Sequence, residues 1–169
     1  MNVEDAIKGR RSIRSFKETP VSNESIRKII EAGTYAPSGK NGQPWRFTVL
    51  TGSAKDELTE LMNRELQSKA SKYGAPAMGS SLSTCLIMKQ APVLIPVWNN
   101  RETFNQPRLV DMMAKLRMIL PSADELLHTV EIQGVSAAIQ NMLLVAYSAR
   151  AHPVDQRHLL CTRRFDYSI

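Results

Sequence analysis

Apolar and polar residues follow one another along the chain in patterns that predict helices near its start. Residues 2–9 have the pattern of a short helix. A second helix is predicted within VSNESIRKIIEAGTYAPS, residues 21–38, where Ser22 or Asn23 is the N-cap and isoleucines share one face (Ile26, Ile29, Ile30). Pro37 ends this helix inside a stretch, APSGKNGQP, that has the composition of a loop.

Two segments have the pattern of β-strands. Residues 45–52, WRFTVLTG, alternate as a half-buried strand does. Residues 91–100, APVLIPVWNN, form a continuous apolar run, which is typical of a buried central strand, although Pro96 weakens that pattern. Between the two strands we expect a polar helix over 53–69 that starts at a Ser53 cap, followed by a loop over 74–83.

The second half of the chain is predicted to be helical. Residues 99–122 are hard to interpret, but their methionines and leucines indicate a helix that packs in the core or forms a lid (Met112, Met113, Leu116, Met118, Leu120). Residues 122–148 have a helical pattern, and GVSAAIQNMLLVAY within them is apolar nearly all round. Such a helix is buried in a core or at a subunit interface. The order of elements predicts a single α+β domain over residues 1–148.

Composition limits the class of protein. The 169 residues are 43% hydrophobic and 22% charged, which is typical of one globular domain, and no apolar run reaches the length of a membrane span. The first residues, MNVEDAIKGR, contain no apolar signal core, and Cys85 and Cys161 have no metal-type spacing. We therefore expect a cytoplasmic protein without a bound metal. The net charge of +6 permits an anionic partner, but sparse aromatic residues argue against nucleic acid.

One short stretch, GRRSIRSF, gathers three arginines beside a serine: Arg10, Arg11, Ser12 and Arg14. The simpler interpretation is a solvated basic face. If the segment is extended, however, alternate side chains share one side, so Arg10, Ser12 and Arg14 point together. Two guanidinium groups around a hydroxyl form a cradle for a phosphate or an electron-rich ring edge.

Three segments in their order and spacing resemble the nitroreductase family of flavoproteins. RRSIRSF is similar to its first flavin-binding signature, AGTYAPSGKNGQPWRFTVL to its second, and AAIQNMLLVAYS to its long helix. The resemblance implies a central, mainly antiparallel sheet flanked by helices, with the long helix buried at a homodimer interface. It also implies FMN as the cofactor, bound where the two subunits meet.

Carried over by position, the resemblance implies a set of FMN-binding residues and no catalytic side chain. Arg10 and Ser12 would hold the phosphate, with Arg11 beside them, and Arg14 would face the pyrimidine side of the flavin ring. The other subunit would close the site with Pro37, Ser38, Asn41 and Gln43.

The implied activity is hydride transfer from NADH or NADPH, through flavin N5, to a nitroaromatic, a quinone or a similar small acceptor. The two half-reactions would alternate in a ping-pong cycle. The alternative is a catalytically impaired protein on the same scaffold that binds flavin or a partner. A small basic nucleic-acid-binding protein is a third, weaker interpretation.

The tail, residues 149–169, departs from the family pattern. The family continues after its long helix with a glycine-rich turn, whereas this chain continues ARAHPVDQRHLLCTRRFDYSI. If residues 149–156 were encoded GCT CGG GCT CAC CCG GTG GAT CAG, loss of the first base would give Leu-Gly-Leu-Thr-Arg-Trp-Ile, which resembles the expected turn. A frameshift and a naturally short ending remain as the two explanations, and in either case part of the usual flavin pocket is expected to be missing.

Overall fold

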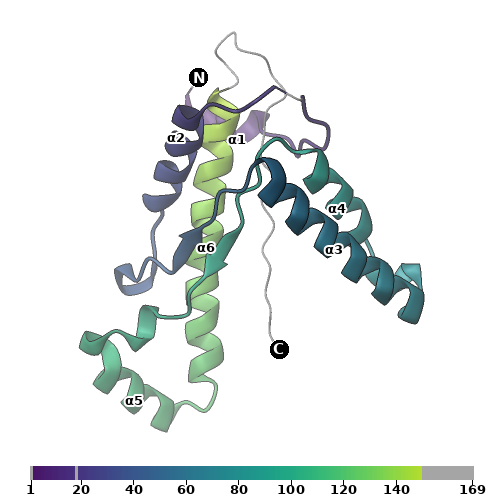
Figure 1. Ribbon diagram of the computed structural model, residues 1–169. Helices are drawn as coiled ribbons and strands as arrows, with labels where there is room; N and C mark the ends of the chain where they lie inside the picture. The colour runs from purple at the N-terminus through teal and green to yellow at the C-terminus, as the bar shows by residue number, and fades with distance from the viewer. Residues whose placement is uncertain (1, 18, 150–169) are drawn as a thin grey trace.

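The computed structural model describes residues 2–17 and 19–149 (Figure 1). The α-helices of this part are α1 (Val3–Gly9), α2 (Asn23–Thr34), α3 (Gly52–Tyr73), α4 (Ser81–Gln90), α5 (Val110–Ile119) and α6 (Ala123–Ser148). The strands are β1 (Trp45–Phe47) and β2 (Val97–Asn99), and short 3-10 helices are η1 (Gly39–Asn41), η2 (Ala75–Met78), η3 (Thr103–Asn105) and η4 (Pro107–Leu109). The predicted α+β class is confirmed. The predictions for the tail lie outside the described residues, except for Ala149.

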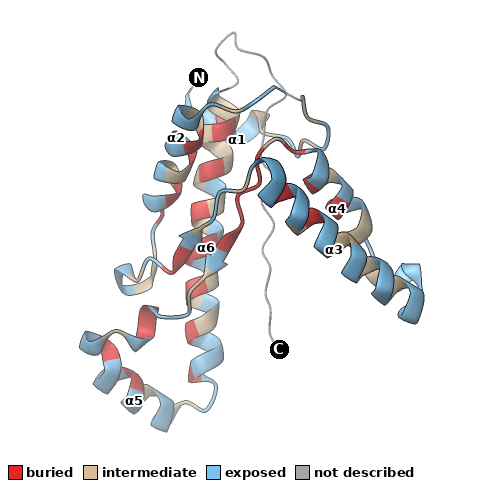
Figure 2. Ribbon diagram, in the orientation of Figure 1, coloured by how far each residue is buried: buried red, intermediate tan, exposed pale blue. Residues whose placement is uncertain are grey.

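The long helix α6 forms the centre of the fold, as Figures 1 and 2 show. Helix α2 packs along it so closely that a Cβ added at Gly33 would lie 3.0 Å from Met142 Cγ. Residues of α2, α6 and both strands form one apolar core, which includes Ile29, Trp45 and Ile95. Ser22 is the N-cap of α2, because its Oγ accepts a hydrogen bond from Ser25 N at 3.2 Å. The predicted helices 21–38 and 122–148 are therefore both present, with one face of α6 buried.

The two strands form a short antiparallel sheet in which Trp45 lies opposite Asn99. Beyond it, Thr48 N donates to Pro96 O at 3.1 Å, but proline has no N–H with which to return that bond. The regular strands therefore end at Phe47 and begin at Val97, and only an isolated bridge between Leu50 and Leu94 lies beyond them, so the predicted strands 45–52 and 91–100 are too long. The predicted burial of the second segment is nevertheless found, since Ile95 is fully buried.

Helices α3 and α4 form an arm that packs mainly on itself and stands away from α6 (Figure 1). The expected Ser53 cap is wrong, because α3 begins at Gly52 after the N-cap Thr51 and continues to Tyr73. The expected loop over 74–83 is also wrong in part, since it contains η2 and the first turn of α4. Serines at the start of α4 give this segment the composition of a loop, although its later residues pack on α3.

A buried lysine joins the two helices of this arm. Lys55 is only 8% exposed, and its Nζ donates to the carbonyl oxygens of Lys89 at 2.8 Å and Ala91 at 3.1 Å. Asp56 lies 3.1 Å from the same nitrogen. The ammonium group therefore satisfies carbonyl oxygens at the C-terminal end of α4, where a positive charge is favourable.

Replacing Lys55 with methionine is expected to lower the free energy of unfolding by about 1–3 kcal/mol, because these carbonyl oxygens lose their donor. Urea unfolding measures the change. Lys69→Met, at an exposed position of the same helix, is the control and should have little effect. Equal destabilisation by both substitutions would contradict this role of Lys55.

Candidate functional site

The segment after α1 forms neither helix nor strand and carries the predicted arginine motif. Arg10 ends the helix with φ −57° and ψ 133°, and Ile13 is half-buried whereas Ser12 and Arg14 are exposed. Arg11 turns back towards the helix, because its Nη1 donates to Lys8 O at 2.8 Å and to Arg10 O at 3.0 Å. The structure thus gives Arg11 a local role at the end of α1 and separates it from the other two arginines.

Arg10 and Arg14 have guanidinium groups without a partner among the described residues. Neither side chain forms a hydrogen bond or ion pair with any residue in 2–17 or 19–149. Two free guanidinium groups with the Ser12 hydroxyl between them are a suitable donor set for a phosphate or an anionic ring edge. The residues present at this end of the molecule therefore fit the group that the motif implies.

The second motif is the part of the second flavin-binding signature over residues 37–43, and it forms a loop with an uncommon backbone. Lys40, Asn41 and Gln43 have φ values of +53°, +52° and +47°, in the left-handed region that residues other than glycine rarely occupy. Pro37, Asn41 and Gln43 are exposed, whereas Ser38 is half-buried and its Oγ accepts a hydrogen bond from Gln43 N at 3.0 Å. A strained loop with exposed polar residues is the kind of feature that functional sites retain.

Close contacts hold this loop in place. A Cβ at Gly42 would lie 2.0 Å from Thr103 Cγ2, so only glycine allows this approach. A Cβ at Gly134, on α6, would lie 3.3 Å from Ser38 Cβ. Arg108 Nη2 adds a hydrogen bond to Lys40 O at 2.9 Å. The surrounding structure therefore fixes the conformation of the loop and offsets the free-energy cost of its positive φ values.

Glu131, a buried residue of α6, supports the loop through Thr103. This role was not predicted from the sequence. It is 5% exposed, and its Oε1 accepts a hydrogen bond from Thr103 N at 3.0 Å, while its Oε2 accepts one from Asn99 Nδ2 at 3.3 Å. This carboxylate positions Thr103 against Gly42. The signal in the sequence is an acid between two aliphatic residues, Val130 and Ile132, beyond the acidic first turn of the helix.

One chain does not bring the two motifs together. Gly9, at the start of the arginine motif, lies against Tyr147, since a Cβ added there would be 2.4 Å from the tyrosine hydroxyl. The loop of the second motif lies against Gly134. These α6 contacts are 13 positions apart, which corresponds to roughly 20 Å at the rise of an α-helix. The predicted site residues consequently form two separate groups at different heights of α6 (Figure 1).

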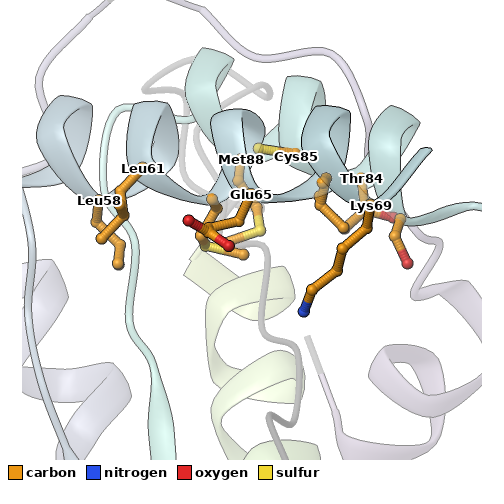
Figure 3. A pocket seen from close by; sticks show the side chains of 10 residues that line it. Leu58, Leu61, Glu65, Lys69, Thr84, Cys85 and Met88 are labelled. Carbon is orange, nitrogen blue, oxygen red and sulfur yellow. The ribbon is translucent and has the colours of Figure 1, made fainter. Parts of the chain in front are cut away.

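A groove of about 330 Å³ lies between α3 and α4, as Figure 3 shows. Apolar side chains line most of it, with Glu65 and Lys69 also contributing. Cys85 lies in its wall, and burial raises the pKa of this thiol against the opposing effect of nearby Lys89. A thiol of raised pKa is a poor nucleophile. Among the described residues no cluster of ligating side chains could hold a metal ion, and no described helix is long and apolar enough to cross a membrane.

Known proteins with similar sequences and folds include nitroreductases. The chain is 46% identical over 57 residues to a nitrobenzene nitroreductase of Ectopseudomonas oleovorans, a match that covers 34% of this chain and 25% of that protein. It is 30% identical over 151 residues to an NADH dehydrogenase/NAD(P)H nitroreductase of Methanothermobacter thermautotrophicus, covering 88% of this chain and 56% of that protein. The chain thus spans between a quarter and about half of these relatives' lengths.

A solved structure and a family model agree with these relatives. The crystal structure of a nitroreductase with bound FMN from Bacteroides fragilis superposes with a TM-score of 0.56 at 27% identity, covering 88% of this chain and 66% of that one. The model of the nitroreductase family matches residues 7–152, which include both motifs and α6. The resemblance of the three segments is confirmed, and the chain belongs to the nitroreductase family.

Proposed function

We propose that this chain is the subunit of an FMN-dependent oxidoreductase that takes electrons from NADH or NADPH and passes them to a nitroaromatic, a quinone or a similar small acceptor. The observation that carries the proposal is the pair of guanidinium groups of Arg10 and Arg14, around Ser12 in the first family motif, which no described residue neutralises. Bound FMN would supply the redox chemistry, by accepting a hydride at N5 from the nicotinamide and releasing it to the acceptor.

The protein's own residues bind and orient in this proposal. Arg10 and Ser12 hold the phosphate through charge-assisted hydrogen bonds. Arg14 lies at the pyrimidine edge, where its positive charge favours electron uptake at the ring. No nucleophile and no acid–base pair is required of the chain, because its part is to position the reactants and to exclude water.

We further propose a homodimer in which a second copy completes each site. The support is the separation of roughly 20 Å between the two motifs along α6, which is too large for one flavin ring to contact both. The loop 37–43 presents Pro37, Asn41 and Gln43 to the outside in a fixed conformation, as a segment that docks on another subunit must. A second candidate is a flavin- or partner-binding protein on the same scaffold that does not turn over.

Absorbance of the purified protein tests the proposal. We expect an oxidised-flavin spectrum that bleaches anaerobically on addition of NADH or NADPH and returns when a nitroaromatic compound is added. A flavin spectrum that neither reductant bleaches would favour the binding protein. A colourless protein that also fails to take up added FMN would overturn the oxidoreductase and leave only a partner-binding protein.

A further inference from the structure

The guanidinium group of Arg108 reaches the backbone of Lys40 in the loop 37–43, although the two residues are 68 positions apart in the sequence. Arg108, in η4, donates from Nη2 to Lys40 O at 2.9 Å and from Nε to Gln106 Oε1 at 2.9 Å. These bonds hold the guanidinium group beside residue 40. Both Lys40 and Arg108 are exposed, so a bound molecule can reach them.

Neither of these charges is neutralised within the part of the chain that the structure describes. Arg46, the basic residue on the neighbouring strand, lies 3.8 Å from Glu102. No described carboxylate lies within 4.0 Å of Lys40 or Arg108. Arg108 uses only two of its N–H donors in its bonds to Lys40 and Gln106, so the rest of its fork stays available. The pair therefore presents two uncompensated positive charges.

Contacts around Lys40 hold its backbone in one conformation. Only its side chain then has to be ordered when a ligand binds, which lowers the entropic cost of binding. Lys40 and Asn41 both have positive φ values, and contacts at Gly39 and Gly42 fix the chain on either side. A Cβ added at Gly39 would lie 2.5 Å from Val130 Cγ1. Preorganised groups lose less freedom when a ligand binds, so more of the interaction energy is retained.

We propose that Lys40 and Arg108 form an anion-binding subsite that selects aromatic electron acceptors carrying a carboxylate over neutral acceptors of the same shape. The proposal rests on the proposed function, because Lys40 lies between Ser38 and Asn41, which we place against the flavin of the neighbouring subunit. An acceptor stacked on that flavin would have its substituents beside this pair of cations. A guanidinium fork with a neighbouring ammonium group matches the two oxygens of a carboxylate.

The test compares 4-nitrobenzoate with 4-nitrobenzamide, which have nearly the same shape and differ in charge. In the holoenzyme dimer, Lys40→Gln and Arg108→Gln are expected to lower the ratio of kcat/KM for the acid to kcat/KM for the amide by roughly five- to tenfold. Arg108→Lys keeps the charge but loses the fork, so its ratio should fall between those of the wild type and Arg108→Gln. Lys115→Gln, an equal loss of charge at an exposed position of α5, is the matched control and should leave the ratio unchanged.

Direct binding provides a readout independent of turnover. Calorimetric titration of the holoenzyme with benzoate and with benzamide should show weaker benzoate binding in Lys40→Gln and unchanged benzamide binding. The ratio for the wild type should also fall as salt is added, because exposed charges are screened.

The same charges could instead receive the 2′-phosphate of NADPH, so each variant is also assayed with NADPH and NADH. A loss confined to the NADPH-to-NADH ratio, with the acceptor ratio unchanged, would overturn the assignment to the acceptor. Unchanged ratios in both variants would overturn the subsite altogether. In either case a normal flavin spectrum and normal bleaching would leave the proposed function standing, whereas their absence would show that the proposed function itself has failed.

Discussion

Replacing Arg10 or Arg14 with alanine is expected to weaken FMN binding by roughly ten- to a hundredfold, because each change removes a charge-assisted contact of about 1.5–3 kcal/mol. Both guanidinium groups lack a protein partner among the described residues, so their removal costs the fold little. Flavin fluorescence during titration of the apoprotein with FMN measures the dissociation constant.

Arg11 provides the matched control for this prediction. It has the same charge and lies in the same segment, but its guanidinium group bonds to the carbonyl oxygens of Lys8 and Arg10. Arg11→Ala should therefore change FMN affinity much less than the other two substitutions. Equal losses for all three arginines would indicate a general charge effect and would contradict the specific cradle.

Alanine at Gly42 is expected to displace the loop 37–43 and to abolish FMN retention through purification. The added Cβ would lie 2.0 Å from Thr103 Cγ2, and Glu131 holds the backbone of Thr103 so that it cannot withdraw. Overpacking of this kind costs about 1–3 kcal/mol of stability. The flavin content of the purified variant and its thermal unfolding measure the two effects.

Thr103→Ala tests whether this steric contact is the cause. The Thr103 hydroxyl is buried and has no hydrogen-bond partner in the described part of the chain, so its loss alone should cost little. In the double variant, removal of Cγ2 and Oγ1 relieves the closest contacts, and part of the flavin content should return. No recovery in the double variant would show that Gly42 acts by another route.

The helices could be predicted where local signals agree with one another. Helix α2 has a Ser22 cap and one apolar face, and α6 has a long apolar pattern, so both segments are found at the expected places. The strands could not be delimited, because the break in their regular pairing depends on Pro96 lying opposite Thr48, a relation between distant segments. Helix α4 was missed because its first turn has the composition of a loop.

In the candidate site, too, local features could be predicted from the sequence and tertiary contacts could not. Its two motifs could be found as strings of residues, since their side-chain chemistry and spacing are local. Their distance along α6, the support from Glu131 and the contact of Arg108 with Lys40 depend on tertiary packing. The positive φ values of Lys40 and Gln43 also had no signal in the sequence, because neither residue favours the left-handed region, whereas Asn41 does.

A heterodimer of two defective subunits tests most directly whether each flavin site is built from two chains. One subunit carries Arg10→Ala and Arg14→Ala, the other carries Gly42→Ala, and different affinity tags allow the mixed dimer to be isolated after co-expression. If the motifs meet across the interface, one site of the mixed dimer combines both defects and the other has none. We expect about one FMN per mixed dimer, reducible by NADH or NADPH, although both homodimers are isolated without flavin. A mixed dimer as empty as its parents would contradict the two-subunit site.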